Sequence, residues 1–117
     1  MNARLSLLAL ITATALGCGG ADDPTLLLYK PTGSLQCTST QTTQARLLAE
    51  VSALRDAGVF VMASSCANDG LPRIALCGAD TGDLFSVTVT PSAEASAGRL
   101  GYKPAAHYPS ARPMACQ

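Results

Sequence analysis

Aromatic side chains and charges are both scarce in this sequence of 117 residues. It contains no tryptophan, two phenylalanines and three tyrosines, so a hydrophobic core has to be built from leucine, valine and alanine. Only 14% of the residues are charged, and eight Lys/Arg balance eight Asp/Glu. Nucleic-acid binding needs a positively charged surface. A near-neutral chain with no basic run therefore predicts no nucleic-acid partner.

Common motifs of enzymes and metal sites are also missing. The sequence has no Gly-x-Ser-x-Gly elbow, no phosphate-binding loop and no dinucleotide fingerprint. It has no C-x-x-C and no H-x-x-x-H pair, and its single histidine, His107, lies in a proline-rich segment. We therefore expect no metal and no cofactor. A periplasmic metal carrier that uses Met62, His107, Met114 or unpaired cysteines is the alternative.

The start of the chain has the layout of a secretory signal. Arg4 is the only charged residue before Asp22, and residues 5–16 are apolar or small. A basic start, an apolar run of about 12 residues and then small residues is typical of a signal that is removed after export. A permanent transmembrane helix needs about 20 apolar residues. We expect residues 1–17 to be a signal peptide.

Cys18 follows this segment directly. Ala15-Leu16-Gly17-Cys18 resembles the lipobox of bacterial lipoproteins, although that family prefers Leu where Ala15 stands and a small residue where Leu16 stands. The resemblance implies that Cys18 carries a diacyl lipid, which anchors the chain stably in a membrane. It also implies a location in the cell envelope, on the outer membrane, with residues 18–25 as a tether. Plain secretion is the alternative.

The remaining cysteines indicate a domain held together by disulfides. Without residues 1–17 the chain loses Arg4, which leaves seven basic against eight acidic residues and enough length for one small domain, residues 26–117. Its four cysteines are Cys37, Cys66, Cys77 and Cys116. In an oxidising compartment they predict two disulfides, with three connectivities open. The domain resembles small cysteine-bearing envelope proteins of Gram-negative bacteria, which implies no particular activity.

Short apolar runs bounded by turn residues predict four strands. Residues 26–29 and 59–63 are continuous apolar runs, as in buried strands. Residues 73–77 predict a third short strand, and residues 85–89 alternate as in a strand with one exposed face. A strand, a helix and a strand in succession suggest a right-handed β-α-β unit with parallel strands.

Two helices complete the predicted pattern. A capping-box pattern from Thr38 to Gln41 predicts the start of the first helix, with Ser39 or Thr40 as alternative caps. Gly58 predicts its end. Its buried face is expected to contain Leu47, Leu48, Val51 and Leu54. A short helix is expected over residues 92–99, before a proline-rich tail from residue 102 that adds an edge strand. The order β-α-β-β-β-α predicts an α+β fold, a single small sheet with both helices on one face, and a ferredoxin-like arrangement as the nearest named fold.

One short motif resembles a catalytic site. Asp80-Thr81-Gly82-Asp83 is similar to the Asp-Thr-Gly motif of aspartic proteases, in which two Asp side chains share a proton. The resemblance implies hydrolase chemistry at Asp80 in a dimer. The same residues are typical of an ordinary hairpin turn, which is the interpretation we favour. A calcium site that also uses Asn68 and Asp69 is a further alternative.

These observations favour a non-enzymatic envelope lipoprotein that acts as a binding or structural module. Its partners would be the membrane, through the lipid at Cys18, and a protein that the sequence does not identify. The alternatives are a hydrolase with acid/base chemistry around Asp80 and a periplasmic metal-binding protein.

The lipid anchor can be tested by the substitution Cys18→Ser. We expect the variant to move from the membrane fraction to the soluble fraction, because its hydroxyl oxygen cannot carry the thioether-linked lipid. Cell fractionation followed by immunoblotting measures the shift, and Thr25→Ser in the tether is the matched control. A wild-type chain that is soluble and carries no added mass at Cys18 would contradict the prediction.

Overall fold

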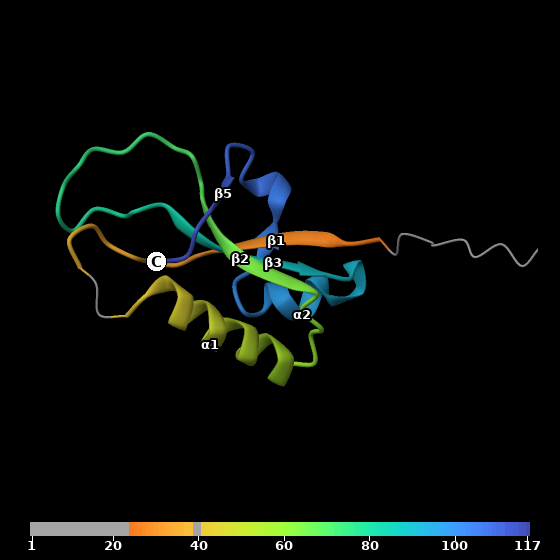
Figure 1. Cartoon of the computed structure of the whole chain (residues 1–117). Coiled ribbons are helices and arrows are strands. Elements are labelled where there is room, and N and C mark those ends of the chain that lie inside the picture. The colour runs from red at the N-terminus through yellow and green to blue at the C-terminus, as the bar shows by residue number, and fades with distance from the viewer. Residues whose placement is uncertain (1–23, 39–40) are drawn as a thin grey trace, which may run out of the picture.

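The computed structural model describes residues 24–38 and 41–117 (Figure 1). The predicted signal peptide, Cys18 and most of the predicted tether lie outside the described residues. Within the described ranges, no helix has the length and apolar character needed to cross a membrane.

Five antiparallel strands form one sheet in the order β4-β1-β3-β2-β5. The strands are β1 (Leu26–Pro31), β2 (Ala63–Asn68), β3 (Asp83–Val89), β4 (Lys103–Pro104) and β5 (Arg112–Met114). Because β3 pairs antiparallel with both β1 and β2, the latter two run in the same direction but are not adjacent. The predicted β-α-β unit is therefore split by β3. The connectivity β-α-β-β-α-β around this split unit is that of the ferredoxin-like arrangement, with β5 as an added edge strand.

Both helices pack on the same face of the sheet. They are α1 (Thr43–Asp56) and the short α2 (Glu94–Gly98), which follows a 3-10 turn. Leu47, Val51 and Leu54 of α1 belong to the same buried cluster as Ala97 of α2. The sheet contributes Leu28, Cys66, Phe85, Val87 and Val89 to this cluster. The α+β class and the placement of the helices are confirmed.

Leu48 was expected on the buried face of α1, but 62% of it is exposed. Successive residues of an α-helix are rotated by about 100°, so Leu48 lies beside the stripe of Leu47 and Val51 rather than on it. Leu48 is therefore a solvent-facing leucine.

The first helix begins later than the capping-box pattern predicts. Thr42 is the N-cap, and its side chain accepts a hydrogen bond of 3.1 Å from the Ala45 amide. Thr38 instead donates to the Leu35 carbonyl oxygen. The neighbouring Cys37 is bonded to Cys77 in the next loop, which fixes the chain just before this segment. The predicted end is confirmed, since Gly58 has a φ of +83°.

Two of the strand predictions are wrong: one strand begins later than predicted, and the other is not a strand. Val59 and Val61 are buried, whereas Phe60 between them is 71% exposed, and β2 begins only at Ala63. The Met62 amide already donates to the Thr88 oxygen of β3. Residues 73–77 form no strand and lie in an exposed loop. The main chain of this segment pairs with a side chain of the preceding loop, described below, and not with the sheet.

The β3 strand is confirmed, but both of its faces are buried. Leu84 and Ser86, on the face predicted to be exposed, retain 1% and 7% exposure. The proline-rich tail covers them: Tyr29, Ala67 and Leu84 pack against Ala105, Tyr108 and Ala111. Alternation in sequence could not predict this cover, because the tail shows no periodicity of its own.

Two disulfides hold the fold, as predicted. The pairs are Cys37–Cys77 and Cys66–Cys116, which selects one of the three possible connectivities. The second bond ties the tail to β2, beside the pairing of Met114 with Cys66. The predicted edge strand from the tail is confirmed as β5.

Two leucines of α1 provide a direct test of this packing. Leu54→Ala removes a side chain with 0% exposure, so we expect it to lower the free energy of unfolding by about 2–5 kcal/mol. Leu48→Ala changes a solvent-facing side chain and is expected to stay within about 0.5 kcal/mol of the wild type. Urea denaturation under non-reducing conditions measures both. Equal losses for the two variants would contradict the described packing.

Candidate functional site

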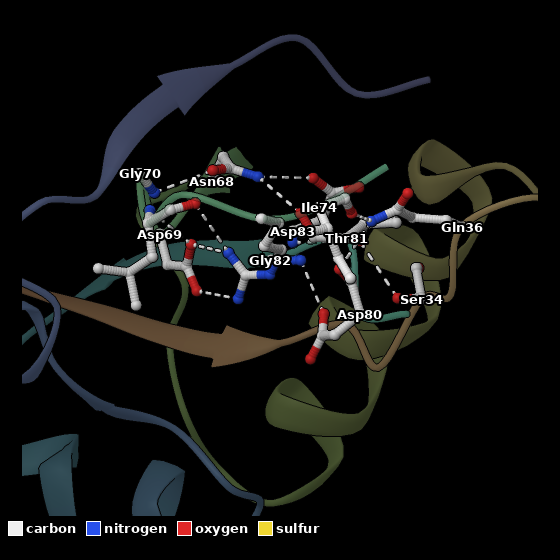
Figure 2. Close-up of polar contacts among 12 residues, drawn as sticks. Ser34, Gln36, Asn68, Asp69, Gly70, Ile74, Asp80, Thr81, Gly82 and Asp83 are labelled. Atoms are coloured by element: carbon white, nitrogen blue, oxygen red, sulfur yellow. Dashed lines mark hydrogen bonds and ion pairs between the residues drawn. The ribbon is translucent and has the colours of Figure 1, made fainter. Parts of the chain in front are cut away.

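The loop between β2 and β3, residues 69–82, takes part in several long-range polar contacts among the described residues (Figure 2). We call it the β2–β3 loop. It lies beside the loop that follows β1, at the end of the sheet opposite to the point where the chain enters β1 (Figure 1). Its residues 71–78 are all exposed.

Asn68 closes the base of the β2–β3 loop. Its side-chain amide donates to the Thr81 carbonyl oxygen and to Asp83 Oδ1, both at 3.1 Å, and its Oδ1 accepts from the Gly70 amide at 2.9 Å. A main-chain bond from the Asp69 amide to the Gly82 oxygen lies next to it. The two strand ends therefore leave the sheet at a fixed separation.

An ion pair stiffens the first half of the β2–β3 loop. Both guanidinium nitrogens of Arg73 bond the two carboxylate oxygens of Asp69, each at 2.6 Å (Figure 2). The hydrogen bonds from Arg73 lower the pKa of Asp69, and the same bonds raise the pKa of Arg73 with help from the charges of Asp80 and Asp83. Paired guanidinium–carboxylate bonds of this kind fix geometry as well as charge.

A calcium site would need the turn at Asn68 and Asp69 to lie next to the turn at Asp80 and Asp83. The two turns are adjacent, because the Asp69 amide donates to the Gly82 oxygen. The guanidinium of Arg73 contacts the carboxylate of Asp69 directly, so this carboxylate already has a cationic partner. Asp83 accepts from Asn68. In the part of the chain that the structure describes, no group of three or more His, Cys, Asp or Glu is placed to hold a metal ion.

Asp80 lies in the return turn of the β2–β3 loop. Its carboxylate accepts from the Gly82 amide at 2.7 Å, and the Thr81 hydroxyl and amide both donate to the Ser34 carbonyl oxygen. The Asp83 amide donates to the Thr81 hydroxyl. Short-range bonds of this kind are those of an Asp/Thr turn. The Asp-Thr-Gly residues thus attach the loop to the segment after β1.

Gln36, in the loop that follows β1, fixes the outer part of the β2–β3 loop. No pattern in the sequence predicted this role. Its side-chain nitrogen donates to the Ile74 carbonyl oxygen, and its side-chain oxygen accepts from the Leu76 amide, each at 3.0 Å. Its main chain bonds Gly78 and Ala79. The adjacent Cys37–Cys77 disulfide adds a covalent link. The only signal in the sequence was the position of Gln36 next to a cysteine.

The side chains that this scaffold displays are apolar. Leu71, Ile74 and Leu76 are 56%, 72% and 57% exposed, and Leu35 of the adjacent segment is 44% exposed. Exposed apolar side chains that gather in one patch are typical of interaction surfaces, and these three lie within six residues of one another. We call Leu71, Ile74 and Leu76 the apolar edge of the loop.

A second polar cluster lies on the helical side of the sheet. Lys30 bonds both carboxylate oxygens of Glu50 at 3.0 and 2.9 Å, and the Tyr102 hydroxyl donates to Glu50 at 3.0 Å. Burial first, and then the charge of Glu50, raises the pKa of Tyr102 above its usual range. The cluster joins β1, α1 and the segment before β4, which is a structural task.

The start of α1 borders a cavity of about 440 Å³. The main-chain oxygen of Gln117 accepts from the Thr43 hydroxyl at 2.9 Å and from the Gln44 amide at 3.1 Å. The Gln117 amide donates back to Thr43. Donors of the first helical turn are therefore already used by the last residue of the chain.

The residues of the metal-carrier alternative are spread over the fold. Met62 precedes β2, and Met114 lies opposite Cys66, on the order of 13 Å further along that strand. His107 lies in a 3-10 turn of the tail. All four cysteines within the described ranges are in disulfides, so they supply no thiolate.

The ion pair at the base of the loop can be tested with Arg73→Met. Without the guanidinium, we expect the pKa of Asp69 to rise toward its usual value of about 3.9. A carboxyl whose pKa is lowered by folding stabilises the fold above its unfolded pKa, and this contribution is lost as the pH falls through the folded pKa. The stability difference between the wild type and the variant should therefore be constant near neutral pH and shrink below about pH 4.

Carboxyl NMR titration of Asp69 measures the pKa, and urea denaturation at several pH values measures the stability difference. Arg55→Met, on the exposed part of α1, is the matched control. An unchanged Asp69 titration in Arg73→Met would contradict the proposed cause of the shift.

Comparison with known proteins identifies no relative: the chain matches no protein-family profile, no curated protein and no solved structure. A functional interpretation therefore depends on the geometry of the β2–β3 loop itself.

Proposed function

We propose that this chain is an exported, lipid-anchored module of the bacterial cell envelope that binds a protein partner through the apolar edge of its β2–β3 loop. The observation that carries the proposal is the exposure of Leu71, Ile74 and Leu76 on a loop that is fixed by a disulfide and by Gln36. Side chains that are already held in place lose little conformational entropy on binding. A preorganised apolar surface is therefore suited to recognition.

The position of the loop agrees with an N-terminal anchor. Leu26 at the start of β1 pairs with Val89, whereas Asn68 at the end of β2 pairs with Asp83 at the other end of β3. The intervening six residues of strand span about 20 Å. A lipid anchor upstream of Leu26 would therefore join the domain at the end of the sheet opposite to the apolar edge.

The charges around the apolar edge favour a protein over a lipid surface. Within residues 69–83, three carboxylates, those of Asp69, Asp80 and Asp83, stand against one guanidinium, that of Arg73. Arg112 of β5 lies opposite Asn68 at the base of the loop and leaves the local balance acidic. Anionic lipid headgroups attract basic segments and repel acidic ones. The two disulfides further support an oxidising, extracytoplasmic compartment.

Site-specific photo-crosslinking in native membranes tests the proposal. A benzophenone side chain replacing Ile74, which is 72% exposed, should give a discrete protein adduct on electrophoresis. The same side chain replacing Leu48, which is 62% exposed on α1, is the matched control and should not give that adduct. Identical patterns from both positions, or none from either, would contradict a binding role for the loop.

A further inference from the structure

The side chain of Gln36 bonds main-chain groups of the two residues that flank Ala75. Its side chain bonds the Ile74 carbonyl oxygen, one residue before Ala75, and the Leu76 amide nitrogen, which belongs to the Ala75–Leu76 bond itself (Figure 2 shows Gln36 beside Ile74). The Cys37–Cys77 disulfide then fixes the residue that follows Leu76. If the Ala75–Leu76 bond were cut, both new ends would still be held by the same two residues of the loop after β1.

The other edge of the same segment is open. The main-chain groups of Ile74 and Leu76, two residues apart, both face Gln36. In an extended strand, alternate residues direct their main-chain groups to the same side. The main-chain groups of Arg73 and Ala75 therefore face the opposite way. In the described part of the chain, the N–H and C=O groups of Arg73 and Ala75 have no hydrogen-bond partner. Proteins that take an extended peptide by strand addition bind alternate main-chain groups and the exposed side chains in this way.

From this geometry we infer that the protein partner is a serine endopeptidase, and that the β2–β3 loop binds in its active site as a substrate-like inhibitor with Ala75–Leu76 as the reactive bond. The inference rests on the proposed function of this loop as a protein-binding surface. It adds the class of the partner and the bond that the partner attacks.

The chemistry explains why such a loop inhibits instead of being consumed. The peptidase serine oxygen attacks the Ala75 carbonyl carbon while the enzyme base takes the serine proton; the C–N bond to Leu76 then breaks, and that proton passes to the leaving amine. With an ordinary substrate the amine diffuses away and water hydrolyses the acyl-enzyme. Here Gln36 and the disulfide retain the Leu76 amine, which attacks the acyl carbon again. The peptide bond re-forms as the ester bond to the serine oxygen breaks, and the amine proton returns through the enzyme base to that oxygen.

Retention of the amine makes the reverse step intramolecular. Groups held in a reactive geometry have effective concentrations of about 10⁵ M or more. The uncut loop is therefore favoured over the cut loop for as long as Gln36 and the disulfide persist.

The side chain at the reactive bond selects the type of peptidase. Ala75 presents only a methyl group, which suits an enzyme with a small primary pocket, as in the elastase type. Arg73 lies two residues away, and its guanidinium is held by Asp69. It is therefore not free to enter the acidic pocket of a trypsin-type enzyme.

The test uses the full chain purified from membranes, with one elastase-type and one trypsin-type serine endopeptidase as probes. We expect competitive inhibition of the elastase type, no inhibition of the trypsin type, and a single slow cut between Ala75 and Leu76 seen by mass spectrometry. Ala75→Arg should transfer the inhibition to the trypsin type. Leu48→Arg, which places the same side chain on α1, should leave the wild-type pattern unchanged.

Gln36→Ala tests the retention of the cut ends. Loss of its two side-chain bonds should raise the rate of cleavage at the same bond, and weaken the inhibition, by about tenfold or more. The disulfide remains in this variant, and its presence is checked by mass spectrometry without reduction.

Rapid cleavage of the wild type without inhibition, or no transfer of inhibition by Ala75→Arg, would overturn the inference. The crosslinking at position 74 then separates the two proposals. A discrete adduct would keep the loop as a binding surface for another class of protein, whereas its absence would remove both.

Discussion

The antiparallel pairing of β3 with both β1 and β2 is the constraint on which the rest of this structure depends. This pairing makes β3 the central strand of the sheet, and 7% or less of every residue from Leu84 to Val87 is exposed. The helices cover one face and the proline-rich tail covers the other. With so few aromatic residues in the core, the Cys66–Cys116 disulfide stabilises this second cover by restricting the unfolded chain.

The same topology produces the β2–β3 loop. Because β2 and β3 are adjacent, the chain between them has to reverse at one end of the sheet, and here it does so with a segment far longer than a tight turn. A loop of this length would ordinarily be mobile. Asn68 closes its base, Arg73 and Asp69 stiffen its first half, and Gln36 with the Cys37–Cys77 disulfide holds its outer part. Its apolar edge is consequently exposed and ordered at once.

Both proposals depend on one property of the apolar edge: its side chains are exposed while its main chain is held in place. Core-forming leucines would be buried if the loop were free to collapse onto the sheet, but its contacts with the segment after β1 hold it outward. Conformational entropy that is lost during folding does not have to be lost again on binding. In a substrate-like loop, the same contacts also keep the two ends of a cut chain together.

Local patterns in the sequence determined the elements with strong periodicity and the chemistry of the cysteines. The α+β class, the face of α1 formed by Leu47, Val51 and Leu54, and the presence of two disulfides followed from spacing and composition. Turn chemistry likewise favoured a hairpin turn at Asp80, where the carboxylate accepts from Gly82. The helix face and the turn depend on residues that are close together in the chain, whereas the disulfides followed from the number of cysteines, which left their pairing open.

Only the tertiary structure decided which residues far apart in the sequence meet. Gln36 reaches the β2–β3 loop across about forty residues of chain, and an isolated glutamine carries no local signal for such a contact. The apolar run 73–77 predicted a strand because hydrophobicity and turn residues do not state whether a partner strand is present. The strands β1, β3 and β2 are each paired on both sides by other strands, so this segment is not part of the sheet. Its hydrophobic side chains became a surface instead of a core.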